Sequence, residues 1–314
     1  MELLITSNSF GKNDPSARQR LRDAGWDIRE NPKGTILSES DMVEAVRGVD
    51  AIILGSDPVT SAVLDSAPEL KLISRYGVGI DNIDMEAAKK RGVDIRVTRA
   101  ANAEAVADFT LGLVLSLLRH IPKANDDLQN GTWKKRRGFD LYQKTVGVIG
   151  CGAIGRRVIS RLKGFQCKIL GYDLKPDSKY FLDNNIKQSS LEEILEKSDI
   201  ITLHVPNASG VTLIGEKELA KMKPDAVLVN TARGGLVDEQ AVLRALKSRN
   251  LYGYGADVFS SEPEIPSYFN GCEDLNLVLT PHMAAVSAEA TSEMTRMAVD
   301  NVLEYFQRKG NDDQ

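Results

Sequence analysis

Short apolar runs alternate along the chain with segments whose apolar residues recur at helical spacing. In the first hundred residues the runs are ELLITS (2–7), DAIILGS (50–56), LKLISRYG (70–77) and VDIRVTRA (93–100). Helical patterns lie near 15–24 and over NIDMEAAKKRG (82–92). This alternation predicts a parallel sheet covered by helices, and the nearly continuous apolar runs are typical of strands buried on both faces.

A second alternating series follows a longer helix, predicted over about 101–120, which we expect Pro122 to stop. A basic loop, NGTWKKRRGFD (130–140), precedes the runs TVGVIG (145–150), KILGYD (168–173), IITLHV (200–205), AVLVNTA (226–232), YGYGADV (252–258) and NLVLT (276–280). A final helical pattern covers 287–308. The fold class is therefore α/β, with two doubly wound parallel sheets.

Length and composition narrow the class of protein. A chain of 314 residues exceeds one ordinary core, which favours two domains. The net charge of −4 gives no general attraction to nucleic acid or anionic membrane, and neither is expected as a partner. The apolar stretch 109–118 is too short for a membrane span of roughly 20 residues. Cys151, Cys167 and Cys272 are too few and too scattered for a zinc site or a disulfide framework. We therefore expect no metal, and a cytoplasmic location, where thiols stay reduced.

The most informative short motif is TVGVIGCGAIGRRV (145–158), in which a buried strand runs through Gly150, Gly152 and Gly155 directly into a helical pattern. The first glycine permits a tight turn, the second lets the backbone approach a pyrophosphate, and the third allows close packing of helix on strand. Asp173, 18 residues later, is placed to accept hydrogen bonds from a ribose diol and to repel a 2′-phosphate. The motif predicts NAD as cofactor; a tight turn and a solvated carboxylate are the alternatives.

Three charged residues follow strands of the second series: Arg233, Glu262 and His282. Reduction of a ketone by a nicotinamide needs a proton for the developing alkoxide, and imidazole supplies one near neutral pH. A carboxylate on the far ring nitrogen would fix the tautomer, and an arginine would hold a substrate carboxylate. Each residue alone is more often a solvated charge. His204 also ends a strand, and spacing does not decide which histidine is the base.

Six segments, in order, resemble the signature segments of the D-isomer-specific 2-hydroxyacid dehydrogenase family. They are SRYGVGIDNID (74–84), NAEAVADFTLGLVLSLLR (102–119), VGVIGCGAIG (146–155), VNTARGGLVDE (229–239), GADVFSSEP (255–263) and LTPHMAA (279–285). The resemblance implies that His282 is the acid/base, Glu262 its partner and Arg233 the residue that binds the substrate's carboxylate or keto oxygen. It also implies that the backbone N–H groups of Val78 and Gly79 hold the substrate carboxylate.

The same resemblance implies the cofactor site. The matching positions are Gly150, Gly152, Ala153, Ile154, Gly155 and Asp173, with His204, Val205 and Pro206 near the adenine and Thr231, Ala232 and Asp257 near the nicotinamide. It implies a flavodoxin-like substrate domain (1–98 plus 287–314) interrupted by a Rossmann cofactor domain (99–286), with the active site in the cleft between them. It further implies a homodimer through helix 101–120 and the loop with Trp133; a core helix and an exposed loop are the alternative.

The substrate is less determined. The segments look most like short 3-phosphoglycerate dehydrogenases, which interconvert 3-phosphoglycerate and phosphohydroxypyruvate, and Arg75 matches an arginine near the substrate of those enzymes. However, Leu54 stands where several relatives have a phosphate-binding arginine, and Arg99 replaces a usual proline. We expect Arg99, with Arg75, to supply positive charge for a doubly anionic substrate such as a phosphate or phosphonate; for Arg99 the alternative is a solvent-facing loop arginine. The alternatives are a glyoxylate/hydroxypyruvate reductase, a reductase of another acid such as phosphonopyruvate, and an NAD-sensing corepressor. Glu262 disfavours a formate-type dehydrogenase, because those members of the superfamily have glutamine in place of this glutamate.

Overall fold

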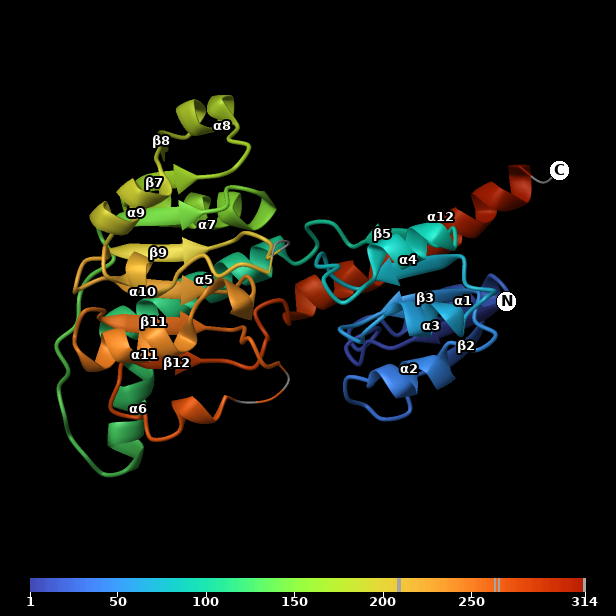
Figure 1. Ribbon diagram of the computed structural model, residues 1–314, viewed down its shortest axis with the longest axis horizontal. Coiled ribbons are helices and arrows are strands. Elements are labelled where there is room, and N and C mark those ends of the chain that lie inside the picture. The colour runs from blue at the N-terminus through green and yellow to red at the C-terminus, as the bar shows by residue number, and fades with distance from the viewer. Residues whose placement is uncertain (208–209, 263, 265, 313–314) are drawn as a thin grey trace. The chain divides into compact units, whose positions relative to one another are not determined.

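The computed structural model describes residues 1–207, 210–262, 264 and 266–312. The chain forms two compact units, Met1–Asn102 with Ala285–Gln314, and Ala103–Ala284 (Figure 1). Each unit contains its own sheet, and each is described separately. Pro263, which ends the predicted segment 255–263, lies outside the described residues, as do Asp313 and Gln314.

The first unit is built on a five-stranded parallel sheet in the order β2-β1-β3-β4-β5, the flavodoxin-like order. Its elements are β1 (Glu2–Ile5), α1 (Ser16–Asp23), β2 (Asp27–Glu30), α2 (Glu39–Ala45), β3 (Ala51–Leu54), α3 (Ser61–Asp65), β4 (Leu72–Arg75), α4 (Met85–Lys90), β5 (Asp94–Val97) and α12 (Ala288–Asp312).

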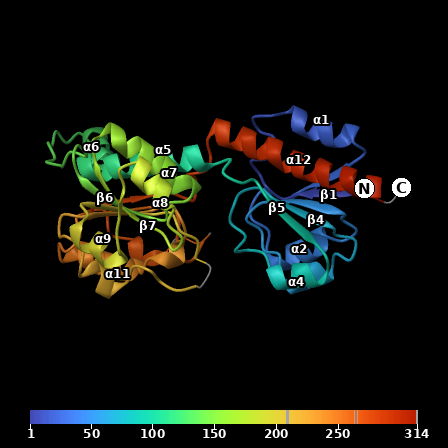
Figure 2. The same cartoon turned by 90° about the horizontal axis from the view of Figure 1, so that it is seen from above.

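Helices cover both faces of this sheet. Figure 2 shows α1 and α12 on one face and α2 and α4 on the other. Leu4, Ile52 and Leu54 belong to the core beneath α2, α3 and α4, and the neighbouring Ile53 is equally buried. Burying each such side chain contributes about 1.5–3 kcal/mol, which is why every residue of β3 is apolar.

The second unit contains a seven-stranded parallel sheet in the order β12-β11-β10-β9-β6-β7-β8. Its elements are α5 (Ala103–Arg119), α6 (Ile121–Gln129), β6 (Thr145–Ile149), α7 (Ala153–Gly164), β7 (Lys168–Tyr172), α8 (Ser178–Asp183), β8 (Lys187–Gln188), α9 (Leu191–Lys197), β9 (Ile200–Leu203), α10 (Glu216–Leu219), β10 (Val227–Asn230), η1 (Gly234–Leu236), α11 (Glu239–Lys247), β11 (Gly253–Ala256), η2 (Ser267–Phe269) and β12 (Leu277–Leu279).

Counted within this unit, the first six strands have the Rossmann order 3-2-1-4-5-6 and β12 adds a seventh. Alternate residues enter cores on opposite faces: Val148 packs with α5 and α7, whereas Ile149 packs with α9 and α11. Figure 2 shows these helix pairs on the two sides of the sheet. The predicted class, two doubly wound parallel sheets, is confirmed.

The predicted helix 101–120 differs in detail. It runs from Ala103 to Arg119, His120 takes a left-handed conformation (φ 53°), and α6 begins at once with Pro122 in its first turn. Pro122 therefore does not act as a stop, because the first turn of a helix needs no N–H from that residue. Among the described residues, no single helix has the length and apolarity of a membrane span; α5 and α6 reach them only jointly, across a 63° bend.

Candidate active site

The predicted residues of the second unit follow the carboxyl ends of parallel strands. Gly150 follows β6, Asp173 follows β7, His204 follows β9 and Thr231 follows β10. Since all strands of the sheet are parallel, these ends share one edge, which is where open α/β sheets bind ligands.

The three glycines of the loop after β6 perform three different tasks. Gly150 has φ +93°, and a Cβ there would lie 2.4 Å from the carbonyl oxygen of His204. A Cβ on Gly155 would lie 2.0 Å from the carbonyl oxygen of Gly150, so α7 packs directly on the loop. At Gly152 nothing stands within 4 Å of the Cβ position, and this residue caps α7 without a side-chain hydrogen bond. The loop therefore has an open side at the helix N-terminus, as a pyrophosphate requires.

Asp173 is tied to this loop. One carboxylate oxygen accepts the N–H of Cys151 (2.9 Å) and the other accepts the N–H of Lys175 (2.9 Å). Each oxygen keeps a second acceptor site. The geometry thus fits the predicted contact with a ribose diol, which remains a prediction.

His204, Val205 and Pro206 form the segment after β9, against which Gly150 packs. Burial lowers the pKa of His204 to about 3, and its Nε2 lies 3.0 Å from the hydroxyl of Thr202. An imidazole that is neutral at physiological pH cannot store a proton for catalysis. Of the two histidines left open by spacing, His204 therefore does not fit the acid.

His282 and Glu262 form a hydrogen-bonded pair. Nδ1 of His282 lies 2.6 Å from Oε2 of Glu262, and the side chains remain 48% and 30% exposed. The other oxygen of Glu262 accepts the N–H of Phe259 at 2.6 Å. Burial raises the pKa of Glu262, but the hydrogen bond and charge of His282, the N–H of Phe259 and the charge of Arg233 outweigh burial and lower it. The Glu262 carboxylate therefore stays ionised. Because Glu262 binds Nδ1 of His282, it is Nε2 that can face a substrate.

A buried carboxylate shapes the turn that carries His282. Asp257 accepts the N–H groups of Met283 (2.9 Å) and Ala284 (2.8 Å) and the hydroxyl of Thr280 (2.6 Å), and its carbonyl oxygen accepts the N–H of His282. His282 itself has φ +50°. Sequence reasoning missed this role of Asp257; its predicted contact with the nicotinamide remains a prediction.

Arg233 follows β10 through Thr231 and Ala232, which are both buried. The amide of Asn230 donates to the carbonyl oxygen of Arg233 (2.8 Å), and the Arg233 guanidinium donates to the carbonyl oxygen of Ala232 (2.6 Å). The hydroxyl of Thr231 lies 3.0 Å from that of Thr110 on α5. The segment is thus fixed at both ends, and the charge of Arg233 reaches Glu262.

Of the predicted substrate residues of the first unit, Arg75 is the last residue of β4, Val78 and Gly79 lie on the loop after β4, and Arg99 follows β5. Arg75 donates to the carbonyl oxygens of Gly79 (2.8 Å), Leu54 (3.3 Å) and Tyr76. Gly77 has φ +139° and donates its N–H to the hydroxyl of Thr98 (2.8 Å). Arg75 therefore holds the loop in shape, whereas Val78 and Arg99 are exposed.

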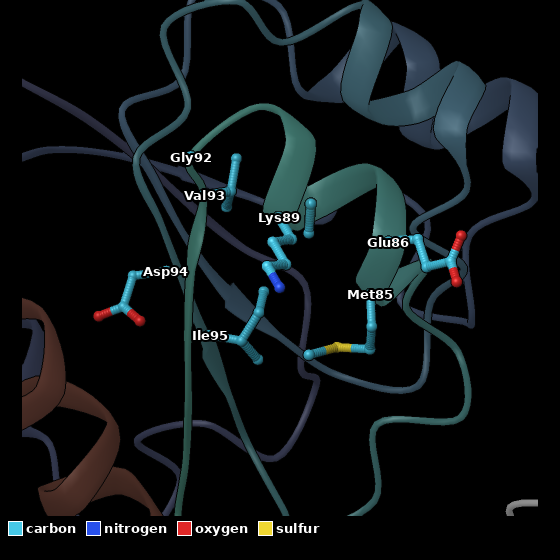
Figure 3. A pocket seen from close by; sticks show the side chains of 8 residues that line it. Met85, Glu86, Lys89, Gly92, Val93, Asp94 and Ile95 are labelled. Carbon is cyan, nitrogen blue, oxygen red and sulfur yellow. The ribbon is translucent and has the colours of Figure 1, made fainter.

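A groove of about 630 Å³ lies in the first unit between α4 and β5 (Figure 3). None of the predicted catalytic, cofactor-binding or substrate-binding residues lines it. In the described part of the chain, no group of three or more histidine, cysteine, aspartate or glutamate side chains is arranged to hold a metal ion.

Comparison with known proteins identifies the family. The profile of the D-isomer specific 2-hydroxyacid dehydrogenase family, NAD binding domain, matches residues 111–284. The chain belongs to this family. The predicted family and its cofactor, NAD, are thereby confirmed, and the dehydrogenase is an NAD-dependent oxidoreductase that acts on small 2-hydroxy and 2-oxo acids.

Curated relatives of this dehydrogenase differ in substrate. It is 38% identical over 296 residues to a glyoxylate reductase of Thermococcus litoralis, covering 89% of this chain and 85% of the relative. It is 36% identical to a D-3-phosphoglycerate dehydrogenase of Methanocaldococcus jannaschii, covering 84% of this chain but 51% of the relative. A solved D-lactate dehydrogenase of Aquifex aeolicus, complexed with NAD and lactic acid, has a TM-score of 0.84 at 27% identity and covers 97% of this chain and 95% of its own.

Proposed function

We propose that this dehydrogenase reduces a short, unphosphorylated 2-oxo acid, such as glyoxylate or hydroxypyruvate, with NADH. The observation that carries the proposal is that the Arg75 guanidinium donates hydrogen bonds to backbone carbonyl oxygens of its own unit. Arg75 therefore serves the fold of its loop, rather than a substrate phosphate. Leu54, at the position of a phosphate-binding arginine in several relatives, is fully buried. The glyoxylate reductase relative supports the same substrate class.

The chain's residues have separate roles in the proposed reaction. The glycine loop and Asp173 hold the cofactor, which supplies a hydride when it is bound. Arg233 holds the substrate carboxylate together with the N–H groups of Val78 and Gly79. His282 donates a proton from Nε2 to the carbonyl oxygen of the substrate, while Glu262 holds Nδ1. In this proposal the unit with α12 binds the substrate and the unit with β6 binds the cofactor.

A screen of NADH oxidation tests the proposal. Glyoxylate, hydroxypyruvate, phosphohydroxypyruvate, pyruvate and phosphonopyruvate are compared by kcat/KM at one pH and ionic strength. We expect glyoxylate or hydroxypyruvate to give the highest value. A higher value for phosphohydroxypyruvate contradicts the proposal, and NADH binding without turnover of any acid favours an NAD-sensing protein.

Phosphohydroxypyruvate is the second candidate because of Arg99. This side chain is exposed and directly follows Thr98, whose hydroxyl accepts the N–H of Gly77. A cation there adds positive charge beside the loop of Val78 and Gly79. If the substrate is phosphorylated, Arg99→Ala raises KM for phosphohydroxypyruvate more than for hydroxypyruvate. Equal effects on the two acids exclude this role of Arg99.

We further propose a homodimer in the cytoplasm. Nine residues of α5 are buried, so its remaining face and the loop with Trp133, which is 85% exposed, provide the contact. The three cysteines are free thiols, which suits a reducing compartment, and the charge of −4 suits neither nucleic acid nor anionic membranes. Light scattering of Trp133→Ala should show a lower mass than the unmodified protein; an unchanged mass rejects this contact.

A further inference from the structure

Two adjacent peptide groups in the loop after β11 are held by two different glutamates. The N–H of Phe259 donates to Glu262, which in turn binds His282. The next N–H, of Ser260, donates to Oε1 of Glu239 at 3.2 Å. The position of the Glu262 carboxylate therefore depends on a backbone that Glu239 also holds.

Glu239 is buried and surrounded by donors. It is 4% exposed, and besides the Ser260 N–H it accepts the hydroxyls of Ser260 (3.1 Å) and Tyr268. A buried carboxylate is costly unless such donors satisfy it. Glu239 is also the first residue of α11, where the helix dipole favours a negative charge.

The same contacts join the loop to the segment that carries Arg233. Glu239 lies six residues after Arg233, and Gly234 lies between them. A Cβ on Gly234 would lie 1.9 Å from the carbonyl carbon of Phe259, so the two backbones touch. Arg233 and Glu262 are thus carried by two segments that are packed together and linked by one carboxylate.

We propose that Glu239 is a positioning residue for the reaction, fixing the Phe259–Ser260 backbone so that Glu262 holds His282 while the segment of Arg233 stays in place. Glu239 touches neither substrate nor cofactor in this proposal, which rests on the roles proposed above for Arg233, Glu262 and His282. Its effect on the reaction passes through the hydrogen bond between Glu262 and His282.

Two conservative substitutions test this role. Glu239→Gln keeps the size of the side chain but replaces an acceptor oxygen with an NH₂ donor, which faces a cluster of donors. Tyr268→Phe keeps the carboxylate and removes one of its hydrogen bonds. Tyr252→Phe is the matched control: it removes the hydroxyl that hydrogen-bonds His120 (2.7 Å), at the amino end of the same strand β11.

We expect Glu239→Gln to lower kcat on the order of 10- to 100-fold, because a shift of about 1 Å at a reacting group has effects of that size. Tyr268→Phe should lower kcat less. The affinity for NADH, measured by fluorescence titration, should not change. The acid limb of the pH profile of kcat should move to higher pH in Glu239→Gln, because a loosened Glu262 loses the hydrogen bonds that lower its pKa. A purely structural role lowers the unfolding temperature and leaves the pH profile in place.

Several outcomes overturn the proposal. The first is an unchanged kcat in Glu239→Gln. The second is a Glu239→Gln variant that loses no more kcat than Tyr252→Phe does when both lower the unfolding temperature equally. The third is a pH profile of kcat in Glu239→Gln whose acid limb does not move. If Glu239→Gln does not fold, Tyr268→Phe decides by the same two readouts. His282→Gln distinguishes a failure of the proposed function from a failure of the positioning role. If His282→Gln keeps full activity, the proposed function fails. If His282→Gln is inactive while the Glu239 and Tyr268 variants behave like Tyr252→Phe, only the positioning role of Glu239 fails.

Discussion

His282 has a left-handed backbone conformation, which is uncommon for a residue other than glycine and which His120 also adopts. Its φ of +50° costs about 1–2 kcal/mol for a residue other than glycine. The turn is held by Asp257, which is buried and binds three groups within residues 280–284. Such strain persists only where the surroundings determine it, and it is common at functional sites. The conformation together with the hydrogen bond to Glu262 supports the proposal that His282 is presented for chemistry.

Replacing His282 with glutamine tests the proton donor directly. Glutamine keeps a polar side chain but offers no proton of suitable acidity, so we expect kcat to fall on the order of 10²–10⁴-fold. NADH binding should stay unchanged, since the glycine loop and Asp173 are untouched. Steady-state kinetics and fluorescence titration measure the two quantities, and an unchanged kcat rejects the assignment.

The lowered pKa of Glu262 predicts how activity depends on pH. A carboxyl group with a depressed pKa is ionised above its ordinary value of 4.5, and its interaction with His282 is lost only as the pH falls through the lower value. We therefore expect kcat to hold as the pH falls to about 4.5 and to decline below it, provided that the fold persists. In Glu262→Gln this acid limb should be absent. A limb retained in that variant belongs to another group.

Sequence reasoning predicted candidate residues of the site but not the contacts that hold them. Arg233, Glu262 and His282 were predicted because they follow strands whose ends meet at one edge. The roles of Asp257 and Arg75 were not visible, since both bind backbone groups of loops, and loop geometry does not follow from residue type. Glu239 was missed because a glutamate at the start of a helix is usually solvated.

At the scale of elements, the periodicity of the sequence predicted both sheets but not every strand in them. β2 has the sequence DIRE without an apolar run, because it is an edge strand with exposed residues. The pattern predicts that Pro122 ends a helix, but proline fits the first turn of α6 equally well. Such choices depend on tertiary packing, which local patterns do not contain.

Substitutions in the glycine loop separate packing from cofactor approach. In Gly155→Ala the new methyl meets the carbonyl oxygen of Gly150, so we expect a loss of about 1–3 kcal/mol of unfolding free energy and weaker NADH binding. In Gly152→Ala no protein atom is displaced, so NADH binding should weaken with little change in stability. Denaturant unfolding and NADH titration measure these effects.

Gly164 provides the control, because it lies at the other end of α7 with nothing near its Cβ position. Gly164→Ala should leave NADH affinity unchanged and raise stability slightly, by up to about 1 kcal/mol. If Gly152→Ala binds NADH as well as Gly164→Ala does, the pyrophosphate does not approach the loop at Gly152.

For the whole molecule, we expect NADH to slow hydrogen exchange in one unit and not in the other. Every predicted contact with NADH lies in the unit Ala103–Ala284. NADH at 100 times its Kd should stabilise the state that binds it by about 2.7 kcal/mol. Hydrogen exchange should then slow in residues 145–173 and 203–206, with β1–β5 unaffected until a 2-oxo acid analogue is added and the 75–79 loop is protected. Equal protection of both units by NADH alone contradicts this division.

The chain passes between its units twice, near residues 102 and 284, so residues 103–284 form one uninterrupted block within a split host. Insertions of this kind are tolerated where the termini of the inserted unit lie close together. In the gene this block is one continuous segment, so recombination can move it whole, and the glycine loop and the His282–Glu262 pair then stay together. If the flanking unit binds the substrate as proposed, exchanging residues 1–102 and 285–314 between relatives should change which acid is reduced while the cofactor-binding unit stays the same.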